Sequence, residues 1–270
     1  MKRNLRLRDS GIELTRSWRG ALPAGGRDAF RQFAILIACY AAYDVARVFV
    51  RGREAVAMSN ALAIMNAEKA LHLYVEPFVQ TMASHVHVLV LFMDWFYSSV
   101  HIPATMLVLV WIYLYRNEAW GFFRNVFLTM NVLAVTIFAV VPVAPPRLVP
   151  TSGVVDTLFL YSSSSYRSGV MSFVTNQYAA IPSLHIGYAL FLSLAIYLLT
   201  TNRLARALAA VYPVVVLGAI VITGNHYLLD AVAGVIVLGV AVFANYGVAR
   251  ESVPELITVS TQAPDDRREA

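Results

Sequence analysis

Two histidines in the C-terminal half of the chain lie in short polar segments beside long apolar stretches. His185 ends the run Ile-Pro-Ser-Leu-His, and His226 lies within Thr-Gly-Asn-His-Tyr-Leu-Leu-Asp, residues 223–230. Neutral imidazole is a competent nucleophile and proton carrier near pH 7. Because each histidine is at the polar edge of an apolar stretch, we expect both at one membrane surface. Together they have the chemistry to cleave a phosphoester bond there.

The residues around these histidines suggest a role for each. Asp230 follows His226 by four positions, so on a helix the two share a face. The carboxylate can then accept a hydrogen bond from one ring nitrogen and leave the other to attack phosphorus. His185 follows Pro182, a residue suited to the first helical turn, where an imidazole can protonate a departing alkoxide. His226, Asp230 and His185 are therefore the predicted catalytic residues.

Binding of the phosphoryl oxygens calls for cations and hydrogen-bond donors. Arg147 is the predicted main clamp, because guanidinium binds phosphate in a bidentate way. Ser183 can donate a hydrogen bond to a phosphoryl oxygen. Asp94 and His101 are seven positions apart on one predicted span, and ionisable groups inside spans mark functional sites. The other candidate substrate-binding residues are Asn225, Tyr227 and Arg167.

The composition indicates a membrane protein. The 270 residues are 59% hydrophobic and 14% charged, whereas soluble domains are about half apolar and a quarter charged. The excess is concentrated in runs long enough to cross a bilayer. We predict an all-α polytopic bundle of six transmembrane helices with additional interfacial helices. The predicted spans are residues 30–50, 93–116, 120–141, 183–200, 205–222 and 227–247.

The expected membrane crossings between residues 53 and 116 depend on two stretches. Residues 53–72 are too polar to cross lipid, so they suit a helix along the surface or packed on other helices. Residues 78–116 either cross twice or begin with an interfacial segment before one crossing from residue 93. The basic turns at Arg116 and Arg203 should share the cytoplasmic side with the basic N-terminus. That requirement favours the single crossing.

The charge distribution sets the expected domains and location. The net charge is +5, and residues 1–31 alone carry eight Lys or Arg and three Asp or Glu. Beside a membrane span this indicates cytoplasmic retention rather than nucleic-acid binding. We predict a basic cytoplasmic tail (1–29), a membrane domain (30–248) and a disordered cytoplasmic tail (249–270). The expected location is the plasma membrane, with both histidines and the loop 142–182 facing the exterior.

Metal and disulfide chemistry are not expected. Cys39 is the only cysteine, which excludes an internal disulfide and a cysteine-rich metal site. His85 and His87 have the spacing of a metal pair but lack a nearby third ligand, so we predict no metal and no cofactor. The expected partners are a lipid phosphate substrate and membrane lipids, and not nucleic acid. Homo-oligomerisation is left open.

The motif pair resembles a known family. Pro182-Ser183-x-His185 followed by His226-x-x-x-Asp230 is similar to the second and third motifs of the type 2 phosphatidic acid phosphatase superfamily. The resemblance covers roughly residues 60–247. It implies a six-helix, metal-independent membrane enzyme that works through a phosphohistidine. His226 would be the nucleophile, Asp230 its partner and His185 the acid.

Departures from the standard motifs suggest one branch of that superfamily. Ala219 and Ile220 stand where a Ser-Arg pair precedes the nucleophile, and Pro145-Pro146-Arg147-Leu148 replaces the first motif. A proline-rich stretch after the third span and a His-Tyr-x-x-Asp run resemble the inositol phosphorylceramide synthase branch. The resemblance therefore implies an inositolphosphotransferase-like enzyme.

Three functions follow from these features. The first is a phosphotransferase that cleaves a lipid-linked phosphoester and passes the phospho-group to an acceptor alcohol. The alternative is a lipid phosphate phosphatase that hydrolyses phosphatidic acid-like or polyprenyl (di)phosphate substrates. A second alternative is a proton-coupled membrane transporter that uses the histidines for coupling. The sequence halves lack matching broken helices, which disfavours the transporter.

Overall fold

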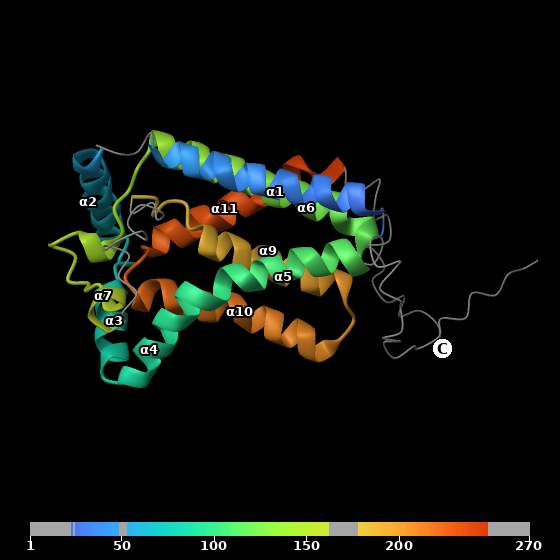
Figure 1. Cartoon of the computed structure of the whole chain (residues 1–270). Helices are drawn as coiled ribbons and strands as arrows, with labels where there is room; N and C mark the ends of the chain where they lie inside the picture. The colour runs from blue at the N-terminus through green and yellow to red at the C-terminus, as the bar shows by residue number, and fades with distance from the viewer. Residues whose placement is uncertain (1–22, 24, 49–52, 162–177, 248–270) are drawn as a thin grey trace, which may run out of the picture.

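The computed structural model describes residues 23, 25–48, 53–161 and 178–247. In this part of the chain the regular elements are helices (Figure 1), and an isolated bridge joins Val143 to Ala179. The longer helices are α1 (Gly25–Val48), α5 (His101–Tyr115), α6 (Asn117–Val140), α9 (Leu184–Leu199), α10 (Arg203–Ile222) and α11 (Leu228–Ala244). The shorter ones are α2 (Glu54–Ala70), α3 (Glu76–Ser84), α4 (His87–Trp95), the π-helical turn η2 (Phe96–Val100), the 3-10 turn η3 (Pro146–Leu148) and α7 (Thr157–Tyr161).

The long helices lie side by side and share one axis direction, whereas α2, α3 and α7 lie at one end of the bundle (Figure 1). We call this the α2 end. Helix α9 is central, because it packs against α5, α6, α10 and α11. The first turns of α9 and α11 are both at the α2 end. The fold therefore brings the segments that carry the two histidines to the same end of the bundle.

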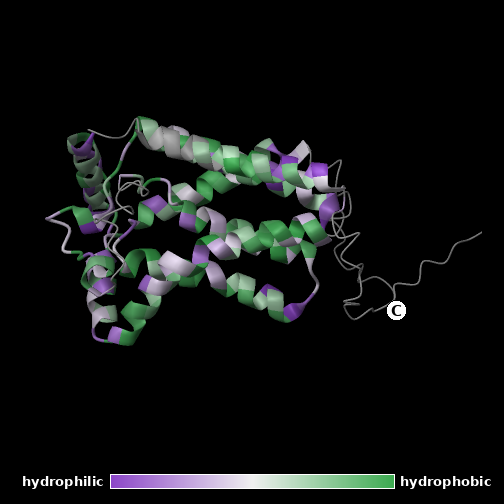
Figure 2. Ribbon diagram, in the orientation of Figure 1, coloured by the Kyte–Doolittle hydropathy of each residue, from purple (hydrophilic) through white to green (hydrophobic). Residues whose placement is uncertain are grey.

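Three helical stretches of the described residues are long and apolar enough to span a membrane: His87–Tyr115, Asn117–Val140 and Arg203–Ile222. Helices α9 and α11 are also apolar but shorter. Large apolar side chains point outward along the bundle, including Leu107 at 69% exposure and Phe243 at 83%. Hydrophilic residues gather at the two ends (Figure 2). These features are those of an integral membrane protein, and three of the six predicted spans have the length and hydropathy that a span requires.

The helices begin and end close to the predicted boundaries, except that two of them begin five or six residues earlier. Helix α1 begins at Gly25 rather than at residue 30. Its polar first turn packs on the bundle, where Asp28 accepts hydrogen bonds from Gln32 and from the Tyr113 hydroxyl, both at 3.1 Å. Polarity alone marked these residues as tail, but their tertiary partners make them helix. Most of the predicted tails 1–29 and 249–270 lies outside the described residues.

The stretch 78–116 contains most of a short helix, followed by one long helical run. Helix α3 ends at Ser84, and the chain is continuous helix from His87 to Tyr115 through α4, η2 and α5. This arrangement agrees with a single crossing, which begins at His87 instead of residue 93. Helix α2, predicted too polar to cross, lies at the end of the bundle (Figure 1).

Candidate active site

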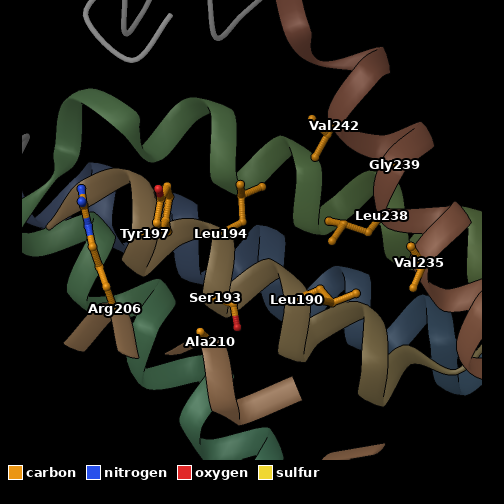
Figure 3. A pocket seen from close by; sticks show the side chains of 10 residues that line it. All are labelled: Leu190, Ser193, Leu194, Tyr197, Arg206, Ala210, Val235, Leu238, Gly239 and Val242. Carbon is orange, nitrogen blue, oxygen red and sulfur yellow. The ribbon is translucent and has the colours of Figure 1, made fainter. Parts of the chain in front are cut away.

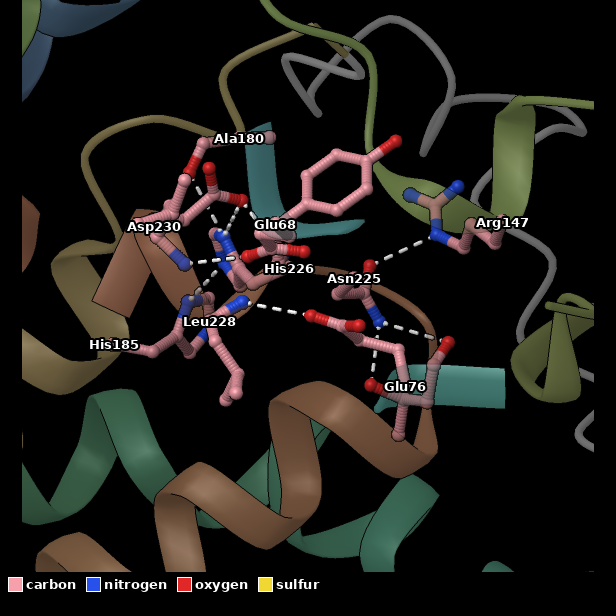
Figure 4. Close-up of polar contacts among 12 residues, drawn as sticks. Glu68, Glu76, Arg147, Ala180, His185, Asn225, His226, Leu228 and Asp230 are labelled. Carbon is pink, nitrogen blue, oxygen red and sulfur yellow. Dashed lines mark hydrogen bonds and ion pairs between the residues drawn. The ribbon is translucent and has the colours of Figure 1, made fainter. Parts of the chain in front are cut away.

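The two histidines are in direct contact. His226 lies in the turn between α10 and α11, and His185 is the second residue of α9. His226 Nε2 is 3.3 Å from His185 Nδ1, although the residues are 41 positions apart in the sequence. Figure 4 shows both rings among a group of polar side chains at this end of the bundle. The convergence that the sequence interpretation required is therefore present.

The hydrogen bonds of His226 fix which nitrogen is free to react. Nδ1 is 2.8 Å from the carbonyl oxygen of Ala180, which can only accept, so Nδ1 carries the hydrogen. The same nitrogen is 3.4 Å from Asp230 Oδ2. Nε2 then holds the lone pair, and His185 Nδ1 is the donor in the contact between the rings. This is the tautomer that a nucleophilic Nε2 requires.

Asp230 has a structural role as well as its contact with His226. The side chain is fully buried, and Oδ2 also accepts a hydrogen bond from the backbone N–H of Tyr227 at 2.9 Å. Its backbone oxygen accepts from the N–H of Ser183 at 2.9 Å, which joins the start of α9 to α11. Asp230 is thus both the first-turn carboxylate of α11 and the orienting partner of His226.

A close crossing of α9 and α11 sets the distance between the histidines. A methyl group at Gly234 would collide with the backbone oxygen of Ser183 and approach the backbone nitrogen of Gly187 to 3.4 Å. Only a residue without Cβ therefore allows the start of α9 to lie against α11. The sequence analysis did not single out Gly234, because a helical glycine can face any neighbour.

Aromatic rings hold His185 in place. It stacks on Tyr97, with ring centroids 4.4 Å apart, and on His101, with centroids 5.0 Å apart. His101 Nδ1 is 3.0 Å from the hydroxyl of Tyr212. His101 therefore reaches the site through His185. Tyr97 and Tyr212 were not predicted, because aromatic residues in an apolar helix give no functional signal of their own.

His101 stacks on His185, whereas Asp94 has no hydrogen bond that connects it to the two histidines in the described part of the chain. Its Oδ1 accepts a hydrogen bond from the Thr157 hydroxyl at 2.6 Å. The prediction that Asp94 and His101 share a face assumed an α-helix between them. The π-helical turn Phe96–Val100 lies there instead, and its wider turn breaks the seven-residue repeat.

Arg147 lies beside the residue that precedes His226. Its Nε donates to Asn225 Oδ1 at 2.9 Å (Figure 4). Its backbone N–H donates to the oxygen of Gly224 at 3.0 Å. Its Nη1 is 3.6 Å from Asp156 Oδ2, which offsets part of the positive charge. Asn225 itself donates to the Thr223 hydroxyl at 2.7 Å. Arg167, the other predicted cation, lies outside the described residues.

Ser183, two residues before His185, and Tyr227, directly after His226, are fully buried. Within the described part of the chain, neither hydroxyl has a hydrogen-bond partner. A buried hydroxyl without a partner is costly, so donation to a phosphoryl oxygen would satisfy it. No three side chains of the described residues are arranged as a metal site.

Three carboxylates hold the start of α11, which follows His226 directly. Each accepts one of three consecutive backbone N–H groups that the helix leaves unbonded. The pairs are Tyr227 with Asp230 (2.9 Å), Leu228 with Glu76 (2.9 Å) and Leu229 with Glu68 (2.7 Å). Glu68 and Glu76 are fully buried and lie near each other in Figure 4. The sequence analysis did not find Glu76, whose role depends on a contact 152 residues away.

Burial is the main reason that the pKa of Glu68 rises to about 8. The nearby Glu76 carboxylate also raises this pKa, whereas the hydrogen bond from the Leu229 N–H lowers it. The folded protein therefore binds more protons than the unfolded chain between pH 4.5 and about 8. Stability contributed by protonated Glu68 is lost as the pH rises through this window.

Glu68→Gln is accordingly expected to flatten the dependence of Tm on pH. Glutamine keeps an oxygen for the Leu229 N–H but cannot ionise. Thermal unfolding of the detergent-solubilised protein across this window measures the effect, with the exposed Glu54→Gln as the matched control. If Tm of the Glu68→Gln variant falls with pH as steeply as that of the unaltered protein, the elevated pKa is wrong.

The fold and this site define a class of protein: a helical membrane protein with a His–His–Asp cluster at one end of its bundle. A model of the PAP2 superfamily matches residues 62–244, which is more than half of the chain. The chain belongs to the PAP2 superfamily. No curated protein and no solved structure matches it. Membership suggests a phosphatase or phosphotransferase, in agreement with the superfamily that the motifs predicted.

Proposed function

We propose that the protein is a membrane phosphotransferase that cleaves a lipid-linked phosphoester through a phosphohistidine on His226. One observation carries this proposal. His226 Nε2 is 3.3 Å from a second imidazole, while its Nδ1 is bonded to the Ala180 oxygen and lies beside Asp230. A nucleophilic nitrogen, a proton donor and an orienting carboxylate therefore adjoin one another.

In the first step the lone pair of Nε2 forms a bond to phosphorus, and the bond from phosphorus to the lipid alcohol oxygen breaks. His185 gives its proton to that oxygen, so the alcohol leaves neutral. The hydrogen on Nδ1 stays in place, and the Asp230 carboxylate stabilises the positive charge that develops on the ring. Ser183, Tyr227 and Arg147 are the proposed donors to the phosphoryl oxygens.

In the second step an acceptor hydroxyl attacks phosphorus, gives its proton to His185, and the bond from Nε2 to phosphorus breaks. Water as acceptor gives a phosphatase, and an alcohol gives a transferase. Transfer requires that water be kept from the intermediate. His226 is only 5% exposed and Asp230 is fully buried, which favours transfer. The replaced Ser-Arg pair and the proline-rich segment around Arg147 favour the inositol phosphorylceramide synthase type.

We also propose the topology. The turns with Arg116 and Arg203 lie at the end of the bundle opposite the histidines (Figure 1). Basic turns favour the cytoplasmic side, so the site would face the exterior of a plasma membrane. With α1, α9 and α11 as further spans the chain would cross six times, which would put both termini in the cytoplasm.

Product analysis tests the transferase proposal. Purified protein in EDTA, given a lipid phosphodiester and a ceramide-like alcohol, is expected to form a new phospholipid containing the alcohol. Release of head-group phosphate with no new lipid would show a hydrolase instead. The His226→Ala variant should form no product. The His85→Ala variant, which alters the exposed C-cap residue of α3, should form product at the unaltered rate.

A further inference from the structure

A cavity of about 560 Å³ lies between α1, α5, α6 and α9 and reaches His185. Its volume falls in the range of ligand-binding pockets, roughly 300–1,000 Å³. The walls are largely apolar; residues on them include Leu36, Cys39, Ile102, Met106, Phe127 and Leu184. These residues belong to the long helices of the bundle, so the cavity extends from the histidine site along the part that the membrane surrounds.

A few polar side chains line the cavity, and His185 is one of them. Asn131 and Tyr188 also line it, and the Tyr188 hydroxyl donates to Asn131 Oδ1 at 2.6 Å. The Asn131 amide nitrogen donates to the Phe127 oxygen at 2.8 Å. The polar groups of these two side chains are therefore already hydrogen-bonded within the protein. His185 is the lining residue that is in contact with the proposed nucleophile.

The outer wall of the cavity lies at the apolar surface of the bundle. Phe33 and Ile37 of α1 and Ile102 of α5 line the cavity and are also 64%, 52% and 47% exposed. A side chain that is both lining and exposed lies at a mouth on the outside of the bundle. The cavity thus connects the lipid-facing surface with the reacting groups.

We propose that this cavity binds the hydrocarbon chain of the lipid alcohol that leaves in the first step. The proposal rests on the proposed function and adds the position of the substrate within the protein. His185 gives its proton to the leaving oxygen, so the chain attached to that oxygen starts at His185, where the cavity begins. An apolar cavity open to the bilayer fits a hydrocarbon chain and gives no partner to a charged head group. The head group then stays with phosphorus on the His226 side.

A second cavity provides a natural control. It measures about 520 Å³, lies among α9, α10 and α11, and is also largely apolar (Figure 3). At its polar end the Arg206 guanidinium lies 4.7 Å from the centre of the Tyr197 ring. None of its lining residues is one of the proposed site residues. A lipid that merely covers apolar surface would occupy both cavities, whereas a substrate chain would occupy the first.

The single cysteine allows a direct binding test, because Cys39 lines the cavity. The protein is reacted with a membrane-permeant maleimide, with or without a long-chain alkyl phosphonate that cannot be cleaved. At ten times its Kd, the phosphonate is expected to slow labelling of Cys39 about tenfold. A short-chain phosphonate with the same head group should not. The control is a Cys39→Ala, Ala210→Cys variant, which places the thiol in the second cavity and should not be protected.

Equal protection of both cysteines, or equal protection by long and short chains, would overturn the assignment. The same labelling in His226→Ala separates the two proposals. Protection there with no turnover supports both, and protection with full turnover keeps the cavity but rejects the nucleophile. Loss of turnover without protection at Cys39 rejects the cavity alone.

A size change gives an independent measurement. Met106→Trp narrows the cavity and is expected to raise KM for a long-chain substrate about tenfold, with little change for a short-chain one. Leu194→Trp narrows the second cavity and should change neither. Equal losses for both chain lengths in Met106→Trp, in protein that elutes and melts normally, would contradict the proposal.

Discussion

His226→Ala is expected to lower turnover by roughly 10³-fold or more. The reason is that Nε2 of His226 is the atom proposed to form the bond to phosphorus, and it lies 3.3 Å from the proposed proton donor, His185 Nδ1. Alanine leaves the apolar packing of α10 and α11 in place. Initial rates with a lipid phosphoester in detergent measure the loss.

The matched control for this change is His85→Ala, because His85 is exposed and its ring nitrogen bonds locally, 2.8 Å from the oxygen of Thr81. It should keep full activity. Both proteins are compared by gel filtration and thermal unfolding before assay. Turnover of His226→Ala within a few-fold of the unaltered protein would exclude the covalent mechanism.

His185→Ala is expected to slow the reaction by about 10²–10⁴-fold for an alkyl phosphoester. The loss should be far smaller for a p-nitrophenyl ester, because that leaving group departs without a proton. The structural basis is that His185 Nδ1 is the hydrogen donor towards His226 Nε2. Rates of the first step for the two esters, measured in single turnover, give the comparison.

The two esters serve as each other's control, since a general disturbance of the site slows both equally. His185 also stacks on Tyr97 and His101, so Tyr97→Phe, which preserves a ring, is a further reference. Its loss should not depend on the leaving group. An equal loss for both esters in His185→Ala would remove the acid role from this residue.

Much of this molecule could be predicted from the sequence. Hydropathy runs located the long helices because burial in lipid imposes a length and a composition on each one. The histidines could be placed at one end because each lies where an apolar run begins. The spacing of His226 and Asp230 predicted their proximity, but for a different reason than the structure gives. His226 lies in the turn before α11 and not on a helix with Asp230; the extended backbone of Tyr227 between them returns the ring to the first turn of α11.

Features that depend on contacts between distant helices could not be predicted. The residues around Glu76 in the sequence do not indicate that it caps α11. The need for glycine at position 234 follows only from its close approach to the backbone of Ser183. The contact of Asp94 with Thr157 could not be predicted either, because the π-helical turn between Asp94 and His101 is invisible in hydropathy. Arg147 was identified by its charge, but its contacts with Asn225 and Asp156 follow from the fold.

The most direct test of the account is to locate the covalent intermediate. The protein is mixed with a substrate labelled in its phosphoryl group, stopped with alkali within one turnover, digested and mapped by mass spectrometry. The account predicts an acid-labile phosphoryl group, with any head group attached, on Nε2 of His226 and on no other residue. Label on a different side chain, or full turnover with His226 unlabelled throughout, would contradict it.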